Sequence, residues 1–191
     1  MKIKMKKIYG IALVVCILVL SIASSTVAYF TSTDDKTTTF TSGNVKIELD
    51  SETANFANVY PGQTIAAPTV VTVTGSENAY VGAVITLNNA YITASNFASI
   101  FGGISNATYK QVDSNTLEVY VICTTELAKN GTFNVYNSIT IPATWDHAEM
   151  TALAATNVTV KAYATQSAGF TSAAQALAAA FPGVWGTTPS N

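Results

Sequence analysis

Asp146, His147 and Glu149 form a stretch of this chain whose residue types could hold a metal ion or move a proton. The surrounding residues 146–155 predict a short helix, on which Asp146 and Glu149 are neighbours while His147 points away from them. A hydrolytic zinc site normally needs three protein ligands and a base, and its HExxH motif does not occur in the sequence. The pattern therefore predicts an exposed helix start, where acidic side chains are favourable, rather than a metal centre.

A second group of acids, Glu48, Asp50 and Glu52, alternates along a strand-like segment and shares one of its faces. Carboxylates in this arrangement could touch a calcium ion. Calcium loops are punctuated by glycine in a DxDxDG pattern, and this chain lacks that pattern. We therefore expect the three carboxylates to form a solvated face, and the sequence predicts neither a metal nor another cofactor.

The sequence offers no set of residues that could work together in nucleophilic catalysis. A Ser/His/Asp or Cys/His arrangement needs a histidine, and His147 is the single one. Cys123 stands alone in a strand-like run, which predicts a small core residue. Cys16 lies in the N-terminal apolar run, so removal of that run would leave Cys123 without a disulfide partner. We expect a protein that is not an enzyme and has no catalytic residue.

The composition favours a β-rich extracellular protein. Charged residues make up 10% of the 191 residues and apolar residues 49%, and many threonines and asparagines lie between the alanines and valines. After Ala28, five lysines remain against eleven acidic residues, which gives a formal charge of −6. A chain this acidic, without a basic cluster, is a poor match for nucleic acid or anionic lipid.

The N-terminus has the three-part order of a secretory signal peptide. Residues 1–7 are basic, residues 8–22 are apolar, and small residues follow, with Thr26 and Ala28 at the two positions that signal peptidase reads. The apolar run as a helix would reach roughly 22 Å, against about 30 Å for the hydrocarbon core of a bilayer. We expect signal peptidase to cleave between Ala28 and Tyr29, so that the chain meets the membrane only before cleavage.

The remainder of the chain shows short alternating segments between turn signals. Pro61-Gly62 marks a turn, residues 75–78 a hairpin loop, and Asn130-Gly131 a further hairpin turn. Phe97 and Phe101 have the i, i+4 spacing of a helical turn. Strands are expected at residues 43–49, 69–74, 79–87, 117–122, 132–141 and 157–165, and short helices at 95–101, at 146–155 and from a cap at Thr171 or Ser172 to Pro182-Gly183.

These elements predict one mainly β domain. We expect an antiparallel, jelly-roll-like β-sandwich with a few short helices, preceded by an N-terminal signal helix. The expected boundaries are a signal peptide at 1–28, an extended N-terminal tail at 29–42, the sandwich at 43–186 and a disordered C-terminus at 187–191. A domain of roughly 140 residues can bury an adequate core without disulfides.

Three segments carry a resemblance to a known family. Residues 28–31 (AYFT), an acidic spacer, and residues 39–45 (TFTSGNV) resemble the TasA/camelysin family, whose members are exported by Gram-positive bacteria after cleavage by a SipW-type signal peptidase. The similarity continues through Pro61-Gly62 and residues 71–87 (VTVTGSENAYVGAVITL). Residues 157–183 resemble the closing segment of clostridial proteins with the same type of signal.

The resemblance implies a jelly-roll sandwich and a secreted protein of the cell surface or biofilm matrix, processed by a signal peptidase. For TasA-like members it also implies self-association into fibres by donor-strand exchange. Camelysin is described as a metalloprotease, but this sequence has no recognisable zinc site, so that activity is the least favoured. The implied donor-strand tail comprises Tyr29, Phe30, Thr31, Thr33, Thr37, Thr39 and Phe40.

Two functions therefore remain open at the level of the sequence. In the first, the proline-free and β-prone tail pairs with an open sheet edge of the next subunit, because an edge strand presents unpaired N–H and C=O groups. In the second, the protein is a monomeric adhesin that binds a glycan or host ligand through exposed Tyr and Asn loops, such as residues 91–96 or Tyr136-Asn137.

Overall fold

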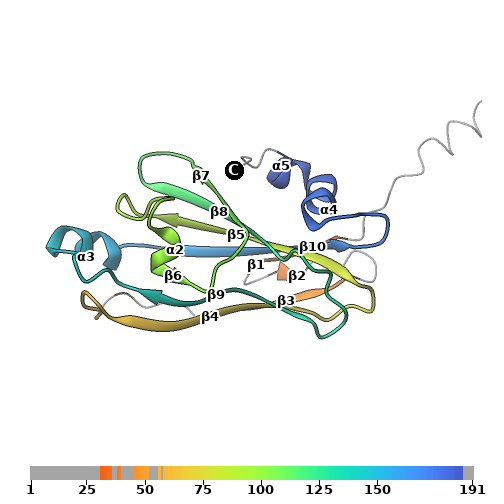
Figure 1. Ribbon diagram of the computed structural model, residues 1–191, viewed down its shortest axis with the longest axis horizontal. Coiled ribbons are helices and arrows are strands. Elements are labelled where there is room, and N and C mark those ends of the chain that lie inside the picture. Colours follow the sequence, from red (N-terminus) through yellow and green to blue (C-terminus); the bar gives the residue numbers. More distant parts are fainter. Residues whose placement is uncertain (1–30, 36–37, 40–44, 52–55, 57, 187–191) are drawn as a thin grey trace, which may run out of the picture.

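The computed structural model describes residues 31–35, 38–39, 45–51, 56 and 58–186, and these form two antiparallel β-sheets packed face to face. Figure 1 shows the two sheets as layers, with short helices at one end and on the outer side of one sheet. The expected mainly β, antiparallel sandwich with a few short helices is confirmed. The expected signal helix lies outside the described residues.

The larger sheet has six strands in the order β2-β1-β10-β5-β8-β7. At its centre, β10 pairs with β5 over nine residue pairs, from Val158↔Leu87 to Gln166↔Ala79. Its strands are β1 (Thr31–Asp35), β2 (Thr38–Thr39), β5 (Ala79–Asn88), β7 (Ala107–Gln111), β8 (Thr116–Ile122) and β10 (Val158–Gln166).

The smaller sheet has four strands in the order β3-β4-β9-β6. These are β3 (Ile47–Ser51), β4 (Thr64–Val73), β6 (Phe101–Gly102) and β9 (Thr132–Thr140). β4 begins before Pro68, whereas the strand expected here was residues 69–74. The β4–β9 register shifts between Ala66 and Thr69, so Pro68 lies at an irregularity where the ladder does not need its N–H group.

The core lies between the sheets and follows from the alternation of apolar residues. Leu117, Val119 and Val121 of β8 are fully buried, as their period of two predicted. Phe133, Val135, Ile139 and Ile141 are likewise buried on β9 and just after it, as expected. Phe97 and Phe101 stack with ring centroids 4.4 Å apart, which confirms the contact expected from their spacing.

Two hairpins that the sequence indicated do not form. Residues 75–78 connect β4 of the small sheet to β5 of the large sheet, so the chain crosses between layers there. At Asn130-Gly131 the chain does turn, with Asn130 at a φ of 65°. The strands on either side, however, pair elsewhere: β8 with β5 and β7, and β9 with β4 and β6. A turn signal fixes a local reversal of the chain and does not fix the sheet that the next strand joins.

Four short helices complete the described fold: α2 (Phe97–Ile100), α3 (His147–Ala154), α4 (Ala173–Ala180) and α5 (Pro182–Trp185). Ser172 caps α4 by accepting a hydrogen bond from the Gln175 N–H (3.3 Å), as one of the two expected caps. Pro182 was expected to end this helix, and it also begins α5, because proline is well suited to a first helical position.

The α4–α5 pair covers the outer face of the large sheet (Figure 1). Its Trp185 ring makes edge contacts with Tyr120 of β8 and Tyr163 of β10, at centroid distances of 5.5 and 6.0 Å. Burial of Tyr120 beneath this helical cap, together with its hydrogen bond to Glu118, raises the pKa of the phenol. Both faces of β5 and β10 are therefore buried in this region.

Gly82 allows the cap to sit directly on β5. A Cβ atom at this position would lie 2.8 Å from Leu177 Cδ1 and from two carbons of the Trp185 ring. We predict that Gly82→Ala lowers the free energy of unfolding by about 1–3 kcal/mol, because the cap must shift or the strand must bend. Urea denaturation measures this. Gly183→Ala is the matched control, since nothing lies within 4 Å of its added Cβ. A Gly82→Ala protein as stable as Gly183→Ala would contradict the packing argument.

Candidate functional site

The part of the expected tail that the structure describes is a strand on the side of β10. β1 runs antiparallel to β10, with Thr31 opposite Thr165 and Asp34 opposite Ala162. Thr31 and Thr33 of the predicted tail therefore belong to β1, and Thr39 belongs to β2. The remaining predicted positions lie outside the described residues: Ala28 and Tyr29 at the cleavage site, and Phe30, Thr37 and Phe40.

The backbone of β10 determines which of its groups are available to β1. Ser167 donates its N–H to the carbonyl oxygen of Asn78 (3.0 Å), so it belongs to the β10–β5 ladder. In an antiparallel ladder every second residue turns its N–H and C=O to the same neighbour. Thr165 and Tyr163 therefore bond toward β5. Ala164, Ala162 and Val160 turn the same groups to the opposite side, where β1 lies.

The two faces of this edge differ in what surrounds them. Ala162 and Ala164 face the core and are fully buried. Tyr163 faces the helical cap, with 8% of its surface exposed, and its ring lies 5.1 Å from that of Phe181. This side of β10 therefore lies between the core and the helical cap.

β1 covers only part of this edge. Its register with β10 ends at Ala162, whereas β10 continues to Val158. The pairing ends there because β2 pairs back onto β1, with Thr38 opposite Asp35 and Thr39 opposite Asp34. Along the described parts of the chain, β5 is the one strand that pairs with β10 from Val158 to Val160.

The sequence indicated the β10 strand and the tail separately and missed that they meet. Residues 157–165 were expected as a strand, which is close to the observed Val158–Gln166. No sequence signal marked this strand as the neighbour of the tail, since strand order results from contacts between distant parts of the chain. β7 was also missed, although Ala107 and Tyr109 alternate with Thr108 and Lys110 and pack against the core.

The acidic group at the start of α3 forms a capping box. Asp146 accepts a hydrogen bond from the Ala148 N–H (2.8 Å), and Glu149 accepts one from the Asp146 N–H (3.1 Å). The hydrogen bonds with the Glu149 side chain and the Ala148 N–H hold the pKa of the Asp146 carboxyl below its ordinary value. Both carboxylates therefore serve the helix start, as their spacing predicted.

The other candidate ligands are spread over the surface. Glu48 and Asp50 are exposed on β3, and Glu52 lies outside the described residues. Among the residues that the structure places, no three His, Cys, Asp or Glu side chains gather closely enough to hold a metal ion. Cys123 is half-buried against the core, where its Sγ lies 3.3 Å from the Thr125 carbonyl oxygen.

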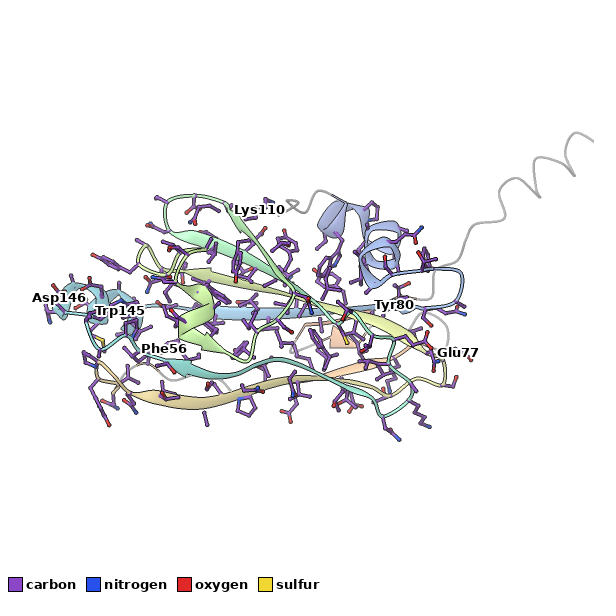
Figure 2. All side chains as sticks on the ribbon, in the orientation of Figure 1. Phe56, Glu77, Tyr80, Lys110, Trp145 and Asp146 are labelled. Carbon is purple, nitrogen blue, oxygen red and sulfur yellow. The ribbon has the colours of Figure 1, made fainter. Side chains whose placement is uncertain are left out.

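A polar pocket of about 430 Å³ lies at the end of the sandwich opposite α3. Figure 2 shows Glu77 at this end and Asp146 at the other. Asn78 donates from its side-chain nitrogen to Glu126 Oε1 (2.8 Å) across the pocket. The lining provides carboxylates, amides and hydroxyls, but no histidine or cysteine that could act with them as a base or nucleophile.

The loops expected to bind a glycan or host ligand differ in their exposure to solvent. Tyr91 is 40% exposed at the end of the sandwich near α3, and Tyr60 is 65% exposed at the same end. Tyr136 was expected on an exposed loop, and this is wrong: it lies within β9 and is 2% exposed. Its ring packs edge-on against Phe101, 5.2 Å away, because a strand irregularity turns it into the core.

We predict that the Asp146 cap makes the stability of the protein depend on pH. Since the folded-state pKa is lower than the ordinary value of 3.8, the stabilisation is present above that value and is lost as the pH falls through the folded-state pKa. Melting temperatures between pH 6 and pH 3 measure this. Asp146→Asn keeps a good cap and should show a smaller decrease. Equal decreases in both proteins would contradict the assignment.

Comparison with known proteins assigns no family to this chain. No protein-family model matches the chain, and neither a curated protein nor a solved structure is significantly similar to it. In the part of the chain that the structure describes, no helix is long and apolar enough to cross a membrane.

Proposed function

We propose that the protein is a secreted structural subunit that associates with copies of itself through its N-terminal tail. The supporting observation is the placement of β1, which lies beside β10 as one more antiparallel strand at the side away from β5. Such a strand needs only an exposed row of N–H and C=O groups, and the same row can take an equivalent strand from another copy.

The proposal assigns the binding energy mainly to the backbone. The tail has few large apolar residues, and the inner side chains of the edge, Ala162 and Ala164, are small. Main-chain hydrogen bonds between strands do not depend on side-chain size. They therefore suit a contact whose side chains contribute little area, and they favour a repeated contact between identical copies.

The proposed location follows from the N-terminal pattern and the resemblance to TasA-like proteins. Export through a signal peptide, with cleavage after Ala28, would place the subunit outside the cell, at the surface or in a biofilm matrix. The acidic composition and low share of charged residues agree with that location. The proposal includes signal peptidase as the processing partner and gives the chain no catalytic activity.

A monomeric adhesin is the second candidate, and the exposed tyrosines favour it. Tyr60 and Tyr91 present aromatic rings at one end of the sandwich, a feature that binding surfaces use. Size-exclusion chromatography of the processed protein separates the candidates. A protein that stays monomeric at every concentration favours the adhesin, whereas growth into large assemblies favours the structural subunit.

We predict that deletion of residues 29–41 from the processed chain abolishes filaments and leaves a folded monomer, because the core residues whose burial the structure describes lie between Val45 and Trp185. Electron microscopy detects the filaments, and circular dichroism checks the β content. Deletion of residues 187–191, at the other end of the chain, is the control and should leave assembly unchanged. Filaments that persist without residues 29–41 would rule out the tail as the donor.

A further inference from the structure

The edge of β10 is longer than the strand that occupies it. β1 and β10 oppose four residue pairs, from Thr31↔Thr165 to Asp34↔Ala162. β10 itself opposes β5 over nine pairs, down to Val158↔Leu87. The part of the edge from Val158 to Val160 is therefore ordered by β5 on one side and is not paired with β1 on the other.

Within this uncovered part, Val160 and the terminal Val158 are the residues whose backbone groups point to the edge, and Val160 is the one inside the strand. The backbone N–H of Cys123 donates to the Val81 carbonyl oxygen (2.9 Å). This bond places the odd-numbered residues of β5 in the ladder with β8. The even-numbered residues of β5 consequently bond to β10, through Thr159 and Lys161. Val160 lies between these two, and its N–H and C=O are directed away from β5.

The described strands of the chain's own tail, β1 and β2, do not cover this part. The chain reverses after Asp35, since Thr38 pairs back with Asp35. It must then reach β3 in the other sheet, which begins at Ile47. A tail from another copy has no such requirement, because its sandwich lies elsewhere and its residues 31–38 can stay extended.

We propose that the whole β10 edge, from Val158 to Thr165, is the acceptor site for residues 31–38 of a second copy of this chain. The inserted segment keeps the register of β1, so that Thr31 stands opposite Thr165 and Thr38 opposite Val158. The inference rests on the proposed function and specifies its acceptor, its register and its competitor. The competitor is the subunit's own β1, which must leave before the second copy's strand can enter.

Strand length gives the direction of the exchange. The four pairs that β1 makes with β10 and the two that it makes with β2 are replaced by eight when residues 31–38 lie straight along residues 158–165, and each further pair adds main-chain hydrogen bonds. In a subunit on its own, the β10 edge is therefore paired with a short strand. In an assembly, the same edge is paired with a longer strand. Assembly should begin slowly, because the short strand has to detach first.

The experiment uses the full processed chain and two variants of one edge residue. Val160→Pro removes the N–H that points to the edge, and an edge position tolerates proline because the β5 ladder does not use that N–H. Val160→Ala is the matched control, since it shortens the same side chain and keeps the N–H. Thermal melts verify that both variants fold.

We expect Val160→Ala to form filaments and Val160→Pro to form none by itself. Its tail is intact, so Val160→Pro should still add to the parent chain but accept nothing further. A tenth of Val160→Pro mixed into the parent protein should shorten the filaments seen by electron microscopy, and the same amount of Val160→Ala should not. Peptides of residues 29–38 should inhibit parent assembly at about tenfold lower concentration than peptides of residues 29–35.

The outcomes separate this inference from the proposed function. A parent protein that forms no filaments, or whose filaments survive deletion of residues 29–41, would overturn the tail as donor. Tail-dependent filaments that grow equally well with Val160→Pro and Val160→Ala would overturn the extended acceptor and leave the proposed function standing. Equal inhibition by the two peptides would also overturn the inference, because residues 36–38 would then add nothing to the pairing.

Discussion

The backbone pairing of β10 is the interaction on which the arrangement of this protein depends. Each β10 residue directs its N–H and C=O either to β5 or to the opposite side. The β5 side is complete along the whole strand, whereas the other side is paired with β1 at one end and continues beyond it. Unpaired backbone groups at a sheet edge need water or another strand. One strand thus carries a complete ladder with β5 and, on its other side, a stretch with which no described strand pairs.

Rigidity of that edge comes from burial on both faces. Ala162 and Ala164 pack into the core, while Tyr163 lies beneath Phe181 and Trp185 of the helical cap. The cap approaches closely because Gly82, on the neighbouring strand, has no side chain. In the proposed association, an edge that is already fixed would lose little conformational freedom when a strand binds, so most of the entropic cost would fall on the tail.

Local patterns were sufficient to predict most of the elements. Alternation in β8 and β10 predicted the strands and their buried residues, and the Asp146 and Glu149 spacing predicted the capped start of α3. Patterns failed where distant contacts decided the outcome. Pro68 lies inside β4 because an irregularity in the pairing with β9 accommodates it, and Tyr136 is buried because the same pairing shifts its register.

The sequence by itself determined the fold class, the main strands and the absence of a motif for catalysis, because alternation, capping and motif spacing depend on residues close together in the chain. The tertiary structure decided that residues 75–78 cross between sheets and that β1 lies on β10. Residues more than 120 positions apart meet at that edge, and no local pattern specifies such a pairing. The candidate site is therefore a property of strand order, which forms only when the sheets assemble.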